Sequence, residues 1–185
     1  MESTLADKNN QYNNKSSFLF DVIKRYDHYI GTTNFKVGLM MSFLGTIILG
    51  LTVRIMLLTP TQNGLSCLGD FAIMTSIITI LFSLFAAIQL FRVVFPNTKN
   101  DCDIDSLIFF GDVSSCKNGS DGYFEKIRNA TDEDLIKDIA VQTYNVAGVV
   151  TEKFRVLKIA VNTIMFFVVP FLAVSLILLI IEGIN

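Results

Sequence analysis

Hydrophobic residues concentrate in three long blocks of the chain. These blocks comprise residues 37–58, 71–95 and 159–181. As helices they would be about 33, 37 and 35 Å long, and each matches the ~30 Å hydrocarbon thickness of a bilayer with some tilt. Hydrophobic residues make up 51% of the 185 residues, too many for the remaining polar surface to cover in a soluble protein. The pattern predicts an all-α integral membrane protein with three transmembrane helices.

Basic residues fix the expected orientation. Of the fifteen lysines and arginines, all except Arg54 lie before residue 37 or between residues 92 and 158. Such residues are retained on the cytoplasmic side of a membrane. We therefore expect the N-terminus to be cytoplasmic and the C-terminus to lie outside. In the same topology residues 96–158 are cytoplasmic, and the turn 59–70 and the tail 182–185 are external.

The polar segments differ in their patterns. Residues 1–16 are polar and Asn-rich and are expected to be disordered. Residues 17–36 carry apolar side chains at three- and four-residue spacing, which predicts a cytoplasmic amphipathic helix. Thr131 is followed by three acidic residues, and this pattern predicts that Thr131 is the N-cap of a long helix. Because no proline follows before Pro170, we expect this helix to continue unbroken into the third span.

Small residues recur every four positions in the first span, at Gly38, Ser42, Thr46 and Gly50. Small residues at this spacing let helices approach closely in lipid and are predicted here to be helix-packing positions. Two arrangements remain open: packing against the second span of the same chain, or self-association between copies. Because each chain is short, we expect other copies to complete the cytoplasmic helical core, which makes the protein a homo-oligomer.

No catalytic constellation is visible. The chain has one histidine, His28, on a largely polar helix face, and it has neither a Walker A loop nor a G-x-G-x-x-G fingerprint. The three cysteines are scattered, so the sequence predicts no disulfide framework and no metal site. A net charge of -2 does not favour binding to a nucleic-acid polymer. We therefore expect a protein that is not an enzyme, with no cofactor and with the lipid bilayer as one partner.

Three segments together are similar to one known family. They are Asn34–Gly38 at the start of the first span, Leu107–Asp112 after the second, and the long helix that contains Tyr144 and Lys153–Arg155. Their order and spacing resemble the small transmembrane effectors of Pycsar anti-phage systems and the similar effectors that accompany CD-NTases in CBASS. The resemblance covers residues 18–181. The chain departs from the family pattern at Asn34, where that pattern has an acidic residue.

The resemblance implies an abortive-infection effector of the bacterial inner membrane. In the family, a cyclase makes a cyclic nucleotide on infection, the nucleotide binds the cytoplasmic part of the effector, and the effector impairs the membrane. A cyclic nucleotide needs a cation or N–H groups for its phosphate and a flat apolar surface for its base. On that basis, the candidate cyclic-nucleotide-binding residues are Arg25, Phe109, Phe110, Gly111, Asp112, Lys126, Tyr144, Lys153 and Arg155.

A plainer interpretation stays open beside this one. The aromatic residues can be core or headgroup contacts, and the basic residues can face anionic lipid. The alternative function is a membrane-anchored structural or adaptor protein that recruits a cytosolic partner through residues 131–157 without ligand gating.

Overall fold

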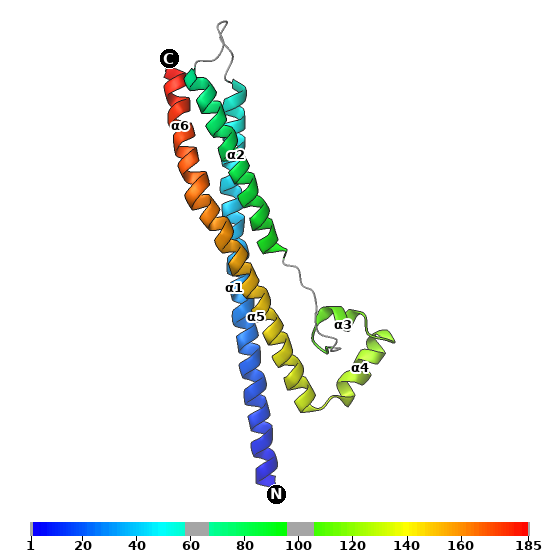
Figure 1. Ribbon diagram of the computed structural model, residues 1–185. Helices are drawn as coiled ribbons and strands as arrows, with labels where there is room; N and C mark the ends of the chain where they lie inside the picture. Colours follow the sequence, from blue (N-terminus) through cyan, green and yellow to red (C-terminus); the bar gives the residue numbers. More distant parts are fainter. Residues whose placement is uncertain (1, 58–66, 96–105, 185) are drawn as a thin grey trace. The chain divides into compact units, whose positions relative to one another are not determined.

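The computed structural model describes residues 2–57, 67–95 and 106–184, and in these residues it is helical with short turns and no strand (Figure 1). Three helical segments are long and apolar enough to cross a membrane. The predicted all-α membrane fold with three spans is therefore confirmed. The elements are α1 (Glu2–Leu57), α2 (Cys67–Val94), α3 (Phe110–Ser114), α4 (Gly119–Asn129), α5 (Asp132–Thr163), the π-helix η1 (Ile164–Val168) and α6 (Val169–Ile184).

The chain divides into two compact units. One consists of Met1–Gly31 with Asn97–Thr151, and the other of Thr32–Pro96 with Glu152–Asn185. The second contains all three apolar blocks, and we call it the membrane unit. The first contains none of them, and we call it the extramembrane unit. Both α1 and α5 contribute residues to both units.

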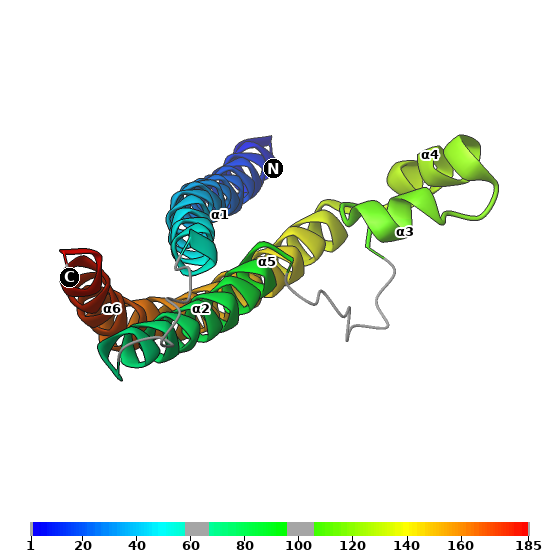
Figure 2. The ribbon, with the colours of Figure 1, turned by 90° about the horizontal axis from the view of Figure 1, so that it is seen from above.

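Within the membrane unit, α2 packs against α6 and η1, and α2 and α6 run side by side (Figures 1 and 2). The contact is made by small side chains of α2 with no exposed surface, because these let two helix backbones approach closely in lipid. They are Ala72, Ser76, Thr79, Ser83 and Ala86. Across the interface the Thr79 and Ser175 hydroxyls are 3.2 Å apart. The small residues of the second span therefore pack against the third span.

The small-residue stripe of the first span has a different environment. Gly38, Ser42, Thr46 and Gly50 are all exposed in the single chain, and a Cβ atom added at either glycine would meet nothing within 4 Å. Packing of this stripe against the second span is thus not what the structure shows. The buried face of the span is instead lined by larger residues, Val37, Leu44, Ile47 and Leu51. Self-association through the stripe stays a prediction.

The third span is helical throughout but is not an α-helix throughout. Proline lacks an N–H group, and its ring clashes with the carbonyl four residues earlier. Directly before Pro170 the chain forms the π-helix Ile164–Val168, whose wider turn accommodates that conflict. On this wider turn Phe167 stacks against Phe82 of α2, with ring centroids 4.8 Å apart. The helix continues unbroken into the third span, as expected, and the structure adds that it passes through one π-helical turn between α5 and α6.

The structure of the N-terminal segment differs from the expectation. Residues 2–16, expected to be disordered, belong to the same helix as residues 17–36. Helices with a polar surface are stabilised mainly by tertiary contacts rather than by propensity. Here Tyr12 and Ser16 are half-buried and line a hollow of about 400 Å³ with Leu135, Ile136 and Ile139 of α5. The polar composition of residues 2–16 did not predict that they form a helix.

The start of α5 agrees with the sequence. The backbone N–H of Asp134 donates to Thr131 Oγ1 at 3.2 Å, and the backbone N–H of Thr131 donates to Asp134 Oδ2 at 3.0 Å. These reciprocal bonds form a capping box with aspartate in the third helical position. They also hold the pKa of Asp134 below its usual value of 3.8, because the N–H and hydroxyl of Thr131 both donate to its carboxylate.

Candidate functional site

Ser106 organises a tight turn in the extramembrane unit. Its side chain accepts hydrogen bonds from the backbone N–H groups of Ile108 at 3.1 Å and Phe109 at 3.0 Å. It also accepts one from Nε2 of Gln142 on α5 at 3.1 Å. The backbone N–H of Ser106 donates to Asp112 Oδ2 at 3.0 Å. Side-chain hydrogen bonds of this kind hold an irregular backbone in place where helical backbone hydrogen bonds are absent. The buried hydroxyl of Ser106 therefore stabilises the backbone conformation just before α3.

Two neighbouring helices hold the same turn. Asp138 of α5 is only 8% exposed, and its Oδ2 accepts the backbone N–H of Leu107 at 2.8 Å. The carbonyl of Leu107 accepts the hydroxyl of Tyr123 on α4, also at 2.8 Å. The second oxygen of Asp138, Oδ1, is buried and has no hydrogen-bond partner, the one such side-chain atom in the part of the chain that the structure describes. We call this set the Ser106 cluster; its members are Ser106, Leu107, Asp112, Tyr123, Asp138 and Gln142.

Four of the predicted ligand residues adjoin the Ser106 cluster or belong to it. Asp112 is a member, and Phe109 and Phe110 follow the turn directly with ring centroids 4.7 Å apart. The Phe110 ring is 78% exposed and offers a flat apolar surface. At Gly111 a Cβ atom would lie 2.6 Å from the Phe109 ring, so any larger residue there would require that ring to move. An exposed aromatic face thus lies beside a cluster of buried hydrogen-bonding groups.

Three further predicted residues belong to the same unit without being members of the cluster. Tyr144 of α5 is 79% exposed, and Arg25 of α1 is also exposed. Lys126 is half-buried in the last turn of α4, which also carries Arg128. The unit therefore has cations for a phosphate group, but the structure does not gather all of the predicted residues around one point.

The ammonium group of Lys153 is hydrogen-bonded within the protein. It belongs to the membrane unit, is 4% exposed, and donates to the backbone carbonyl of Val93 at 2.6 Å, to that of Val94 at 3.4 Å and to Asn34 Oδ1 at 3.2 Å. Its ammonium group thus covers carbonyls at the C-terminal end of α2, where the helix dipole favours a cation. Burial lowers the pKa of Lys153 from its ordinary value of 10.5. The three bonds leave this buried cation unsuited to contacting a phosphate.

Arg155 is also engaged within its own helix. Its guanidinium group forms a two-point contact with the carboxylate of Glu152, at 2.8 and 2.7 Å. Both side chains are largely exposed, so the pair is solvent-screened and can exchange partners readily. Arg155, like Lys153, belongs to the membrane unit, and the structure does not join the two to Phe109 within one compact unit.

Sequence reasoning missed three residues of the Ser106 cluster. None of Ser106, Asp138 and Gln142 was a candidate: Ser106 lies just before the segment Leu107–Asp112, and Asp138 and Gln142 lie on the long helix without belonging to the residues singled out there. A weak signal was present, because Asp138 and Gln142 stand four residues apart on α5 and flank Ile139, which is 5% exposed. A carboxylate and an amide placed next to an apolar helix face at that spacing suggest a buried polar contact. Their partner, Ser106, lies too far away in the sequence for that pattern to find.

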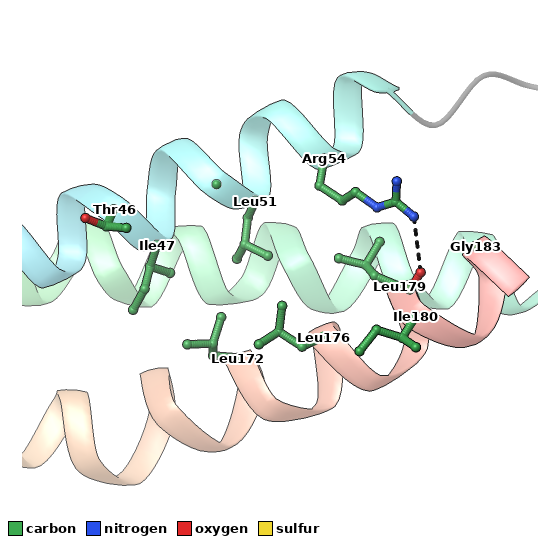
Figure 3. A pocket seen from close by; sticks show the side chains of 10 residues that line it. Thr46, Ile47, Leu51, Arg54, Leu172, Leu176, Leu179, Ile180 and Gly183 are labelled. Atoms are coloured by element: carbon green, nitrogen blue, oxygen red, sulfur yellow. Dashed lines mark hydrogen bonds between the residues drawn. The ribbon is translucent and has the colours of Figure 1, made fainter.

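A second hollow lies in the membrane unit between α1 and α6 (Figure 3). It has a volume of about 530 Å³ and is mostly apolar, with Thr46 and Gly50 of the small-residue stripe on its wall. At one end, Arg54 Nη2 donates to the Leu179 carbonyl at 3.4 Å. A Cβ atom at Gly183 would lie 2.7 Å from the same nitrogen, so the glycine gives the guanidinium group its room. Arg54 thus contacts the backbone of the third span.

The chemistry of the Ser106 cluster is that of recognition by hydrogen bonds. No group of three or more histidine, cysteine or acidic side chains able to hold a metal ion occurs among the described residues. His28 is exposed on α1. What the extramembrane unit offers a ligand is a buried carboxylate, hydroxyl and amide groups, an exposed aromatic ring and nearby cations.

A family model described as the Pycsar effector protein domain matches residues 18–181, which is nearly the whole chain. Neither a curated protein nor a solved structure matches it.

Proposed function

This chain belongs to the Pycsar effector protein domain family, whose members are effectors of anti-phage defence, and from that premise we propose how it acts. It senses a cyclic nucleotide with its extramembrane unit, on the cytoplasmic side of the bacterial inner membrane. Binding then causes the membrane unit to impair that membrane, which arrests growth before phage are released. The N-terminus is cytoplasmic and the C-terminus external in this proposal, following the distribution of basic residues.

One observation carries the proposal further than family membership. Helix α5 carries Asp138 and Gln142, whose side chains bond to the turn that begins at Ser106, which we call the Ser106 turn. The same helix continues through η1 and α6 to Ile184 without a break. A single helical segment therefore contributes both to the candidate site and to the third span. A ligand that binds one arrangement of the turn better than another shifts the population of that arrangement. Because this helix is continuous with the third span, it is a route by which the change at the turn reaches the membrane.

Lys153 supplies a second element of this route. It lies on α5, between Gln142 and the third span, and its ammonium group holds the last carbonyls of α2 and the side chain of Asn34 on α1. The helices that lead into all three spans therefore meet at one buried cation. Any change in α5 that withdraws this side chain leaves the end of α2 without its hydrogen-bond donor. Because buried polar groups are costly to leave unpaired, such a joint favours two discrete states over gradual deformation.

A second candidate function rests on exposed apolar side chains of the extramembrane unit. Phe110, Phe124 and Tyr144 are 78%, 64% and 79% exposed. Large exposed apolar groups commonly mark interaction surfaces. They favour either a further copy of the chain, as an oligomeric effector needs, or a cytosolic protein that an ungated membrane adaptor recruits.

A binding screen separates these two functions. The full chain, purified in detergent, is tested by thermal shift and calorimetry against the 3′,5′-cyclic mononucleotides and a set of cyclic dinucleotides. A specific ligand at one hundred times its Kd stabilises a protein by about 2.7 kcal/mol, so a single nucleotide should raise the melting temperature clearly. The linear 5′-monophosphate of the same base is the matched control. A well-folded protein that responds to no cyclic nucleotide would contradict the sensor and favour the adaptor.

A further inference from the structure

The carboxylate of Asp138 is held in an unusual state. The side chain is 8% exposed, and Oδ2 is occupied by the backbone N–H of Leu107 at 2.8 Å. Within the described part of the chain, Oδ1 is buried and accepts no hydrogen bond. A buried carboxylate oxygen without a donor is costly, and native folds rarely leave one so. Where they do, the unpaired atom points to a missing partner, which at this position is a hydrogen-bond donor.

We propose that Asp138 Oδ1 accepts a hydrogen bond from an N–H group on the base of the bound cyclic nucleotide, and so helps to select that base. This inference rests on the proposed function and assigns one end of the ligand to one atom of the site. Beside the unpaired oxygen, two features support it: the charge of the carboxylate and the exposure of the Phe110 ring, which follows the turn in sequence.

The charge decides which end of the ligand lies here. A cyclic nucleotide carries a phosphate anion at one end and a neutral base at the other. Two anions in a buried site repel each other, whereas a carboxylate and an N–H group form a strong charge-assisted bond. The phosphate is therefore excluded from Asp138. The cations of the last turn of α4 belong to the same unit and have the right charge for the phosphate end.

The aromatic neighbour supports the same orientation. Phe110 follows the turn that Asp138 holds, and its ring is 78% exposed. Stacking on an exposed ring suits any planar base, so Phe110 supplies affinity without selection. The unpaired oxygen supplies selection, because bases differ in where they place their N–H groups.

Burial of Oδ1 also couples binding to movement. The atom is closed to solvent, so a base reaches it only when the neighbouring backbone opens. The Ser106 turn is the segment bonded to Asp138, and the hydrogen bonds that hold it to α4 and α5 come from the side chains of Tyr123, Asp138 and Gln142. Ligand entry thus displaces the turn whose anchors lie on α5. Recognition of the base and the start of the conformational change are then one event.

Asp138→Asn in the full chain tests the proposal. The variant keeps the shape of the side chain and an oxygen for the Leu107 N–H, but places an N–H donor where Oδ1 stood. Affinity is measured by calorimetry for the four 3′,5′-cyclic mononucleotides. We expect the nucleotide that the wild type binds best to lose at least about tenfold in affinity, with little change in melting temperature, because one buried polar atom without a partner replaces another. Glu133→Gln, an exposed acidic position on the same helix, is the matched control and should bind like the wild type.

The outcomes separate this inference from the proposed function. If the wild type binds a cyclic mononucleotide and Asp138→Asn binds it equally well, the base contact is wrong and the sensor function stands. If the wild type binds none of the four and none of the cyclic dinucleotides of the screen, both are contradicted. A second measurement needs no variant: methylation of the N–H group on the base of the preferred nucleotide should weaken wild-type binding by a similar factor. Methylation at a ring carbon is its control, and equal losses from both analogues would also overturn the proposal.

Discussion

The two units of this protein are held together by different forces. Every buried apolar side chain among the described residues belongs to the membrane unit, with the single exception of Ile139. The groups buried in the extramembrane unit are otherwise polar, namely Ser106 and Asp138. The membrane unit therefore has a packed interior of its own, whereas the extramembrane unit depends on a few hydrogen bonds around one turn.

This difference suggests that the two units have different roles in the proposed function. A small unit with almost no apolar core is marginally stable in water and opens easily. The stability of such a unit rises when a ligand or another copy of the chain binds to its folded form. Packed helices in lipid resist gradual deformation and change between discrete arrangements instead. Two units of these kinds, which share the helices α1 and α5, are what the proposed ligand-gated effector requires.

The largest effect is expected from Ser106→Ala. The substitution removes one oxygen that accepts from two backbone N–H groups and from Gln142. Loss of this acceptor should cost the extramembrane unit about 2–3 kcal/mol, because buried donors are left unpaired. Hydrogen exchange at Ile108 and Phe109 should accelerate accordingly. Ser114→Ala, whose exposed hydroxyl bonds only within its own helix, is the control, and equal protection in both variants would show that the turn has other support.

A comparable effect is expected in the membrane unit from Lys153→Met. The apolar stem is kept, but the carbonyls of Val93 and Val94 lose their donor. We expect a loss of about 2 kcal/mol, seen as a lower melting temperature in detergent. Lys158→Met, at an exposed position on the same helix, should melt like the wild type. If the two variants melt alike, Lys153 is not the joint between the three spans.

A smaller effect is expected at the contact between α2 and α6. The hydroxyls of Thr79 and Ser175 are 3.2 Å apart, and both are fully buried. Hydrogen bonds between helices in membranes contribute about 0.6 kcal/mol on average. A double-mutant cycle with Thr79→Val and Ser175→Ala should give a coupling energy of that size. A coupling above about 2 kcal/mol would mean that hydrogen bonding, rather than close packing, joins these helices.

The smallest effect concerns pH and the start of α5. Hydrogen bonds from Thr131 lower the pKa of Asp134 in the folded state from 3.8. A carboxyl with a lowered folded pKa stabilises the fold above its unfolded pKa, and that contribution is lost as the pH falls through the folded value. Between pH 5 and pH 3 the wild type should therefore begin to lose a small increment of helix stability. Asp134→Asn should not show that increment in thermal melts, and identical pH profiles would contradict the capping box.

Sequence patterns predicted the membrane fold well, because they depend on strong local signals. The three apolar blocks are long enough to specify spans without tertiary information. Thr131 followed by acidic residues specified the start of α5 for the same reason. The correction at residues 2–16 and the unpredicted π-helix arose where local signals were weak. The polar residues 2–16 carry no apolar periodicity, and a π-helix before Pro170 follows from the packing of one helix as much as from its composition.

The candidate site was predicted only in part, for a physical reason. Phe109, Phe110, Gly111 and Asp112 form one contiguous motif, so a resemblance could find them together. Ser106 and Asp138 meet only through folding, and neither has an unusual sequence context. Lys153 was predicted to be an accessible cation like its neighbours Arg155 and Lys158, which are exposed. Lys153 itself is only 4% exposed. Its burial depends on the end of α2 and on Asn34, which no local pattern reveals.

Ligand-triggered leakage from vesicles tests the central claim most directly. The full chain is reconstituted into vesicles loaded with a fluorescent dye, and the cyclic nucleotide that stabilises it in the binding screen is supplied on both sides of the membrane. We predict dye release from the wild type that follows nucleotide occupancy, and release from Asp138→Asn only at nucleotide concentrations at least about tenfold higher. Saturating nucleotide binding without any dye release would contradict a gated membrane effector.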